Sequence, residues 1–218
     1  MYFKNRAEAG RQLADQLVKK YRGKPCAVVC LNDGAVVVGA QIAMQLHCVM
    51  MMLLTDSIDL PRETTPLAGL SQDGTLTYNN FYSPGEIDEF MAEYHGVVEE
   101  QRLQKLHELH QLVGRGGLIR KDLLRDHNVI VVSDGMNGGF SLDIAAAFFK
   151  TIQIKRLVVA VPFANVAAVD RMHILADEIY CLSVIEDYIS TDHYYDNNDI
   201  PKHEAVLKTI EEIVENWQ

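Results

Sequence analysis

Long apolar runs, an excess of basic residues and paired cysteines are all missing from this chain of 218 residues. Its longest apolar run, residues 48–54, is far shorter than the roughly 20 residues that span a bilayer, so we expect no membrane partner. The 20 Lys and Arg are outnumbered by 30 Asp and Glu, which gives a formal net charge of −10. Because proteins that bind nucleic acids need a basic face to neutralise phosphates, this balance also argues against a nucleic-acid partner.

The 4 cysteines include no Cys-x-x-Cys pair. Three lie within apolar runs and Cys26 opens another, which is typical of buried free thiols. The first residues form a charged amphipathic pattern without the apolar stretch of a secretory signal. We therefore expect a cytoplasmic protein. The length, with 48% hydrophobic residues, favours one α/β domain over residues 1–218.

Short apolar runs alternate with helical patterns along most of the chain. Strands are expected at residues 26–31, 48–54, 129–132, 157–161 and 179–184. Helices are expected at residues 5–21, 36–46, 85–113, 141–150 and 165–175, with a terminal helix from Pro201. The polar stretch 55–84 is expected to be a flexible loop or a short hairpin. This order predicts an α/β fold in which a parallel sheet is covered by helices on both faces.

The most informative stretch of the sequence runs from residue 129 to residue 144. An apolar run ends at Ser133-Asp134, a glycine-rich turn follows, and Ser141 opens a helical pattern. The turn contains Gly135, Asn137, Gly138 and Gly139. Glycines let the backbone approach an anion closely, and the N-terminus of a helix offers N–H groups and a positive dipole end. The stretch predicts a phosphate-binding loop, although a tight connection closed by a serine cap is the simpler alternative.

Ligands of parallel sheets bind beyond the carboxyl ends of the strands. That rule selects three loops of this chain, which are residues 32–35, 133–141 and 185–199. We expect them to lie around one site.

With these elements in place, the chain resembles a type I phosphoribosyltransferase of a bacterial branch. Similar segments are residues 3–10, residues 63–74, the strand before Pro162, and Tyr194-Tyr195-Asp196. The most specific match is residues 131–141, which corresponds to the motif that binds phosphoribosyl pyrophosphate. The resemblance implies a parallel-sheet core with a small hood built from the termini, residues 185–200 forming the hood segment. It further implies a homodimer that uses Mg²⁺ with phosphoribosyl pyrophosphate and transfers the phosphoribosyl group to a nucleobase.

The chain departs from the family pattern at the chemical positions. Ser133 and Asp134 stand where the family has two adjacent carboxylates that commonly hold the ribose hydroxyls. Gly138-Gly139-Phe140-Ser141 replaces Thr-Gly-x-Thr, so the backbone N–H groups and the last hydroxyl are kept.

The expected pyrophosphate loop, Asn32-Asp33-Gly34-Ala35, has an aspartate where the family usually has an arginine and two glycines. Two like charges about 4 Å apart at an effective dielectric near 20 repel by roughly 4 kcal/mol. Asp33 would therefore oppose pyrophosphate, unless it points away or holds Mg²⁺.

Tyr188 follows the last strand, where the family often offers a ring that stacks on the base, and a half-buried packing tyrosine is the alternative. No catalytic residue is identified, and His107 and His110 are typical of a solvated helix face rather than a metal site. Two functions remain open. The protein either transfers a phosphoribosyl group or is a catalytically degraded nucleotide-binding or regulatory protein of the same fold. A nucleotide-binding domain of another doubly wound family is a third reading, which leaves the terminal matches unexplained.

Overall fold

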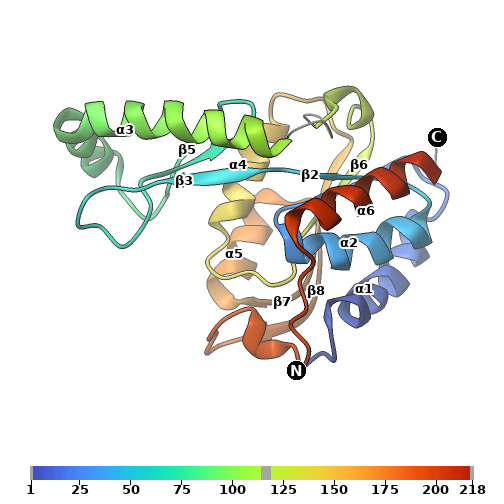
Figure 1. Ribbon diagram of the computed structural model, residues 1–218. Coiled ribbons are helices and arrows are strands. Elements are labelled where there is room, and N and C mark those ends of the chain that lie inside the picture. The colour runs from blue at the N-terminus through green and yellow to red at the C-terminus, as the bar shows by residue number, and fades with distance from the viewer. Residues whose placement is uncertain (1, 114–118, 217–218) are drawn as a thin grey trace.

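The structure is a computed structural model that describes residues 2–113 and 119–216. Its centre is a five-stranded parallel sheet with the order β2-β1-β6-β7-β8, and a three-stranded antiparallel sheet, β3-β4-β5, lies beside it (Figure 1). The parallel strands are β1 (Cys26–Cys30), β2 (Val49–Met52), β6 (Asn128–Val132), β7 (Arg156–Asn165) and β8 (Glu178–Ile185). The antiparallel strands are β3 (Thr55–Ile58), β4 (Ala68–Ser71) and β5 (Leu76–Tyr78). The α/β class predicted from the sequence is confirmed.

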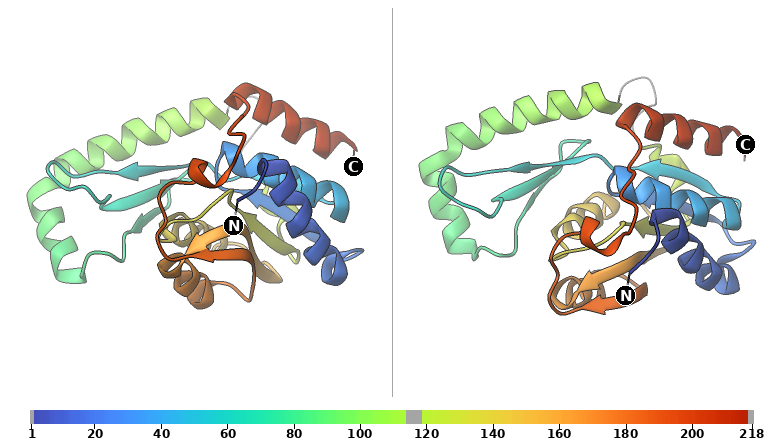
Figure 2. Two further views of the ribbon diagram at one scale, coloured as in Figure 1. Left: turned by 90° about the horizontal axis from the view of Figure 1, so that it is seen from below. Right: turned by 60° about the horizontal axis from the view of Figure 1, so that its bottom comes forward.

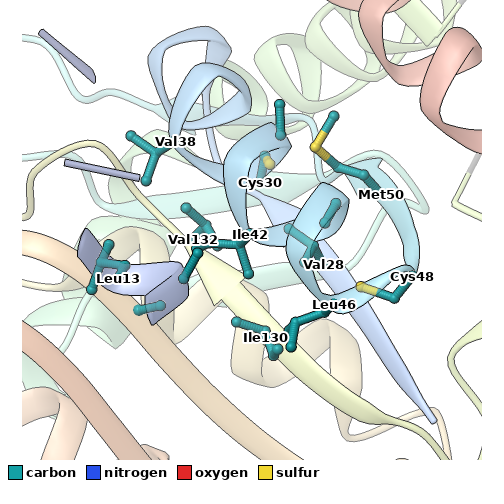
Figure 3. Packing of buried hydrophobic residues seen from close by; sticks show 14 of the residues in the cluster. Leu13, Val28, Cys30, Val38, Ile42, Leu46, Cys48, Met50, Ile130 and Val132 are labelled. Atoms are coloured by element: carbon teal, nitrogen blue, oxygen red, sulfur yellow. The ribbon is translucent and has the colours of Figure 1, made fainter. Parts of the chain in front are cut away.

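Helices cover both faces of the parallel sheet. They are α1 (Arg6–Tyr21), α2 (Asp33–Leu46), α4 (Phe140–Phe149), α5 (Val166–Leu175) and α6 (His203–Asn216). Helix α3 (Pro84–Val113) lies over the antiparallel sheet instead, and short 3-10 helices lie at Lys121–Leu123 and Asp192–Tyr194. Alternate residues of the central strands point to opposite faces, so β1 gives Val28 to one core and Val29 to the other. The first core lies under α1, α2 and α6 (Figure 3), and the second under α4 and α5.

This arrangement creates a crossing point between β1 and its neighbour β6. The helix after β1 returns on one face of the sheet, whereas the helix after β6 returns on the other. At such a point the two connecting loops diverge and leave a crevice at the carboxyl edge of the sheet. The loops concerned are residues 32–35 and 133–141.

Two boundaries differ from the sequence prediction for local reasons. The side chain of Asn32 accepts a hydrogen bond from the Ala35 N–H and caps α2, so residues 33–35 form its first turn rather than a separate turn. Strand β7 continues beyond Pro162, where the sequence predicted its end. Pro162 lies past the last pair with β6, Ala160 with Val132, so its missing N–H interrupts no pairing with that strand.

Residues 55–84, expected to be a flexible loop or short hairpin, form the antiparallel sheet. Asp73 and Gly74 close the β4–β5 hairpin, with Gly74 at φ +84°. Helix α3 packs over this sheet with its own apolar cluster, and the two project together to one side of the parallel sheet (Figures 1 and 2).

The N-terminal segment and the residues after β8 lie side by side (Figure 2). The Phe3 N–H donates to the Tyr194 carbonyl, and the Asp196 N–H donates to the Phe3 carbonyl. We call the N-terminal segment together with residues 185–200 the hood. Its side chains Phe3, Tyr194 and Tyr195 form a small buried apolar cluster with Ala9 of α1 and Phe163 of β7.

The cysteines lie in or beside the cores. Cys26, Cys30 and Cys48 are buried and Cys181 is partly buried, and all four are free. Burial raises the pKa of the Cys48 thiol to about 12, which keeps it protonated and unreactive. Within the two described ranges, no helix is long and apolar enough to cross a membrane.

Candidate functional site

The loops after β1 and β6 touch each other at one point. A methyl group added to Gly34 would lie 2.1 Å from Oδ2 of Asp134 and 2.8 Å from Nε of Arg6. Only glycine therefore fits at position 34 without a shift of the neighbouring groups. Arg6, the first residue of α1, lies at the same point. The third loop that the sequence selected, residues 185–199, also reaches it, because Asp192 accepts a hydrogen bond from Arg6.

The loop 133–141 is held in shape by the end of β7. The Met136 N–H donates to the Phe163 carbonyl and the Asn165 N–H donates to the Met136 carbonyl, each at 3.1 Å. The Asn165 side chain accepts from the Gly138 N–H at 3.1 Å and donates to Oδ1 of Asn137 at 2.6 Å. Asn137 is thus part of the loop's own hydrogen bonding.

The bend before α4 needs its glycines. Gly138 and Gly139 have φ values of +77° and +80°, which side chains rarely adopt. Gly139 is the N-cap of α4 and no side chain caps this helix, so the alternative of a serine cap by Ser141 does not hold. Within the described part of the chain, no acceptor takes the N–H groups of Gly139, Phe140 and Ser141. The bend therefore presents unpaired donors at the positive end of α4.

A cation lies beside this bend that sequence reasoning missed. Arg171 of α5 packs against Gly139, because a methyl group on Gly139 would lie 3.0 Å from its Cβ. Its guanidinium pairs with the buried Asp143 in the first turn of α4, with Nε 2.5 Å from Oδ1. Neither residue belongs to a recognisable motif, so only the packing of α4 on α5 reveals the pair.

The side chains of Ser133 and Asp134 both have partners inside the protein. The Ser133 hydroxyl donates to the Gly135 carbonyl at 2.8 Å, and Ser133 is buried. Oδ2 of Asp134 accepts from Nε of Arg6 at 2.7 Å, and both side chains are almost fully buried, 6% and 2% exposed. The Tyr195 hydroxyl donates to the Asp134 carbonyl at 2.6 Å.

Arg6 ties the hood to the loop. Besides Asp134, its guanidinium donates to Asp192 at 2.7 Å and to Asn198 at 3.3 Å, and it lies 4.5 Å from the ring centroid of Tyr195. Burial lowers the pKa of Arg6, but the hydrogen bonds to the two carboxylates outweigh it and raise the pKa overall. The only sequence signal for this role is the match of residues 3–10 to the opening helix of the family.

Burial also decides the state of Tyr195. It raises the pKa of the phenol, and the nearby Asp134 carboxylate raises it further. Tyr195 is therefore a permanent hydrogen-bond donor to the loop backbone.

Asp33 is turned toward α6. Its Oδ1 lies 2.9 Å from Nδ1 of His203, the first residue of that helix. The loop 32–35 contains no lysine or arginine, so it lacks the basic residue that the family usually has in its pyrophosphate loop.

Mg²⁺ finds few protein ligands here. Both acidic side chains at the crossing point, Asp33 and Asp134, already have basic partners. Within residues 2–113 and 119–216, no three His, Cys, Asp or Glu side chains gather as a metal site. The residues present do not fit a metal ion held by protein carboxylates.

Tyr188 belongs to the hood and lies against the loop 133–141. Its hydroxyl shares a hydrogen bond of 2.7 Å with Thr191, and its ring packs 6.0 Å from Phe163 and 5.6 Å from Tyr194 between centroids. Burial raises its pKa. A methyl group on Gly135 would lie 2.7 Å from its hydroxyl, so Tyr188 borders the loop. These contacts favour the packing alternative, and base stacking stays a prediction.

Sequence comparisons point to one family. Two curated proteins of Mycobacterium tuberculosis, from strains CDC 1551 and H37Rv and both named "Putative phosphoribosyl transferase", are 26% identical to this chain over 197 residues. The match covers 89% of this chain but 43% of each relative, so the chain spans less than half of their length. No family model matches the chain.

Solved structures show the same fold. The protein TT1426 of Thermus thermophilus superposes with a TM-score of 0.76 at 25% identity, over 97% of this chain and 99% of that one. A hypoxanthine phosphoribosyltransferase of Staphylococcus aureus gives a TM-score of 0.50 at 14% identity, over 86% of this chain and 77% of that one. The chain is a phosphoribosyltransferase-like α/β protein by fold. The resemblance to the type I phosphoribosyltransferase family that its motifs indicate is confirmed.

Proposed function

We propose that the protein binds a 5-phosphoribosyl group with its phosphate at the bend of residues 138–141. The observation that supports this most strongly is the set of unpaired N–H groups at Gly139, Phe140 and Ser141 on the uncapped end of α4. Such groups bind a phosphate without any charged side chain. Arg171 beside the bend is already paired with Asp143, so the attraction for a phosphate in this chain of net charge −10 comes from the backbone N–H groups and the positive end of α4.

The reaction that fits this ligand is transfer of the phosphoribosyl group from phosphoribosyl pyrophosphate to a nucleobase. The pyrophosphate would lie at the N-terminus of α2, beside Gly34. Transfer of this kind passes through a centre with oxocarbenium character, which positioning and charge stabilisation favour without a covalent intermediate. Mg²⁺ would enter the site bound to the phosphates of phosphoribosyl pyrophosphate. The roles proposed for the residues above do not require the metal ion.

Binding of a nucleotide without turnover is the second candidate. It is favoured by the acidic residue in the pyrophosphate loop, Asp33, and by the absence of a basic residue at positions 32–35. Nucleoside monophosphate would then bind, whereas phosphoribosyl pyrophosphate would bind no better than the monophosphate.

Calorimetric titration with ribose 5-phosphate, a nucleoside monophosphate and phosphoribosyl pyrophosphate tests both candidates. Pyrophosphate release with a panel of nucleobases then measures turnover. Tighter binding of phosphoribosyl pyrophosphate together with pyrophosphate release supports the transferase. Binding of the monophosphate at least as tight as that of phosphoribosyl pyrophosphate, without pyrophosphate release, supports the second candidate. No binding of any phosphoribosyl compound contradicts both.

The location of the phosphate is tested by a matched pair of variants. Gly138 is exposed, and a Cβ there would meet nothing within 4 Å. Gly138→Glu and Gly138→Gln share the same shape and the same backbone strain and differ only in charge. We expect Gly138→Glu to bind ribose 5-phosphate at least about tenfold more weakly than Gly138→Gln, or roughly 1.4 kcal/mol. Equal affinities would place the phosphate elsewhere.

We also propose that the protein is a cytoplasmic homodimer, as the family resemblance implies. Sedimentation equilibrium at micromolar concentration tests the dimer, and a monomer mass across the range would contradict it.

A further inference from the structure

The first turn of α4 contains an anion that belongs to the protein itself. Asp143 lies one helical turn after Gly139, because its N–H donates to the Gly139 carbonyl at 3.2 Å. Its side chain is 6% exposed, and its Oδ2 is buried without a hydrogen-bond partner among the described residues. A carboxylate in the first turn of a helix is attracted by the positive end of the helix dipole. Asp143 therefore competes with any other anion for the positive end of α4.

Arg171 is the cation that offsets this carboxylate. Its Nε lies 2.5 Å from Oδ1 of Asp143, and its Nη2 contacts the same oxygen. Both charges lie beside the bend, since Arg171 also packs against Gly139. Because buried charges are screened less than exposed ones, an unpaired Asp143 would repel a phosphate at the bend. The pairing with Arg171 removes most of this repulsion.

The aliphatic part of Arg171 supports the bend from the side of α5. A methyl group on Gly139 would lie 3.0 Å from Cβ and 3.2 Å from Cγ of Arg171, and 3.5 Å from Cα of Ala168. These contacts hold the backbone at Gly139, whose φ is +80°. Arg171 thus acts on the backbone N–H groups of the bend as well as on the charge beside them.

We propose that Arg171 is a positioning residue for phosphate binding, which acts by neutralising Asp143 and supporting Gly139 rather than by touching the phosphate. The inference rests on the proposed function, because it concerns the same bend. It assigns opposite effects to the two side chains of the pair. Asp143 weakens the binding of phosphate, and Arg171 limits that effect.

Calorimetric titration of variants with ribose 5-phosphate tests the inference. Arg171→Gln leaves Asp143 unpaired, and we expect binding at least about tenfold weaker than in the wild type. Asp143→Asn removes the competing charge and releases the guanidinium, so binding should become at least about threefold tighter. In Arg171→Gln/Asp143→Asn both charges are absent, and the affinity should return to within about threefold of the wild-type value.

Arg156→Gln is the matched control. It changes the net charge by the same amount at the start of β7, where Arg156 pairs with Glu178, and we expect it to bind ribose 5-phosphate as the wild type does. If the pair only stabilised the fold, both single variants would bind more weakly and the double variant would not recover, which would overturn the inference.

Two further outcomes are distinct. Binding by the wild type that is unchanged in Arg171→Gln overturns this inference alone, whereas absence of binding to the wild type overturns the proposed function with it. If Arg171→Gln does not fold, Asp143→Asn decides by the sign of its effect. Tighter binding supports the inference, and unchanged or weaker binding contradicts it.

Discussion

The guanidinium of Arg6 contacts side chains from two segments that lie far away in the chain, Asp134 and Asp192. It gives the buried carboxylate of Asp134 a charged donor in place of water, so this side chain has one fixed partner. At the scale of single residues, this pair explains why the loop and the hood keep one relative position.

We therefore expect the loss of Arg6 alone to lower the free energy of unfolding more than the loss of both Arg6 and Asp134. Removal of one partner from a buried ion pair destabilises by about 3–5 kcal/mol, because a buried charge is left alone. We predict that Arg6→Gln lowers the free energy of urea unfolding by this amount, and that Arg6→Gln/Asp134→Asn is more stable than Arg6→Gln. For Arg156→Gln, whose side chain is about half exposed, we expect less than about 1 kcal/mol. A double variant less stable than Arg6→Gln would contradict the argument.

The charge of Asp33 gives a second prediction at this scale. Two unit charges roughly 8 Å apart at an effective dielectric near 40 repel by about 1 kcal/mol. Asp33→Asn keeps a hydrogen bond to His203 but loses the charge, so phosphoribosyl pyrophosphate should bind about fivefold more tightly, with ribose 5-phosphate affected less. Calorimetry measures both. An equal gain for the two ligands would mean that Asp33 does not face the pyrophosphate.

At the scale of elements, the parallel strands and most helices follow from apolar runs and caps. Asn5 caps α1 by accepting from the Glu8 N–H, while the Glu8 side chain accepts from the Lys4 N–H. Apolar runs and helix caps involve residues that are close together in the chain, so they can be predicted from the sequence. The antiparallel sheet is different, because β3–β5 are only three or four residues long and are stabilised by α3.

Part of the candidate site could likewise be predicted from the sequence, and part could not. The glycine bend follows from local backbone rules, and its position at the strand end follows from the order of elements. The partners of Asp134 and Asp33 come from residues 6 and 203, which no local pattern connects to them. Their roles therefore needed the tertiary structure.

Gly135 is one of the contacts between the loop 133–141 and the hood. A methyl group there would lie 2.6 Å from Phe163 and 2.9 Å from Thr191. We predict that Gly135→Ala pushes the hood away, so that hydrogen exchange speeds up in residues 185–199 by at least about tenfold while β1 and β6 stay protected. Gly85→Ala is the control, since a Cβ there meets nothing. Unchanged exchange in the hood would show that the contact is not essential.

The β4–β5 hairpin gives a prediction about pH. Burial alone would raise the pKa of Asp73, but hydrogen bonds from Lys121, Ser71 and Thr75 lower it to about 2. The unfolded chain binds the proton more readily, near the ordinary aspartate pKa of 3.8, so this stabilisation is complete above that value and is lost as the pH falls toward about 2. Between pH 5 and pH 2.5, Asp73→Asn should lose less unfolding free energy than the wild type. The exposed Asp88→Asn should behave as the wild type, and equal losses in all three would contradict the assignment.

At the scale of the whole molecule, the parallel sheet places two helix N-termini, those of α2 and α4, on either side of one crossing point. The hood lies beside this edge and is fastened to it through Arg6 and Tyr195. If the proposed function is right, this acidic protein binds an anion through backbone N–H groups and helix dipoles rather than through its net charge.

The measurement that tests this account most directly is a titration of the ¹⁵N-labelled protein with ribose 5-phosphate, followed by amide chemical shifts. The account predicts that the largest changes occur at Gly139, Phe140 and Ser141, and that they are much smaller in Gly138→Glu than in Gly138→Gln. Saturable binding whose largest shifts lie away from residues 138–141, or the absence of any saturable shift, would contradict it.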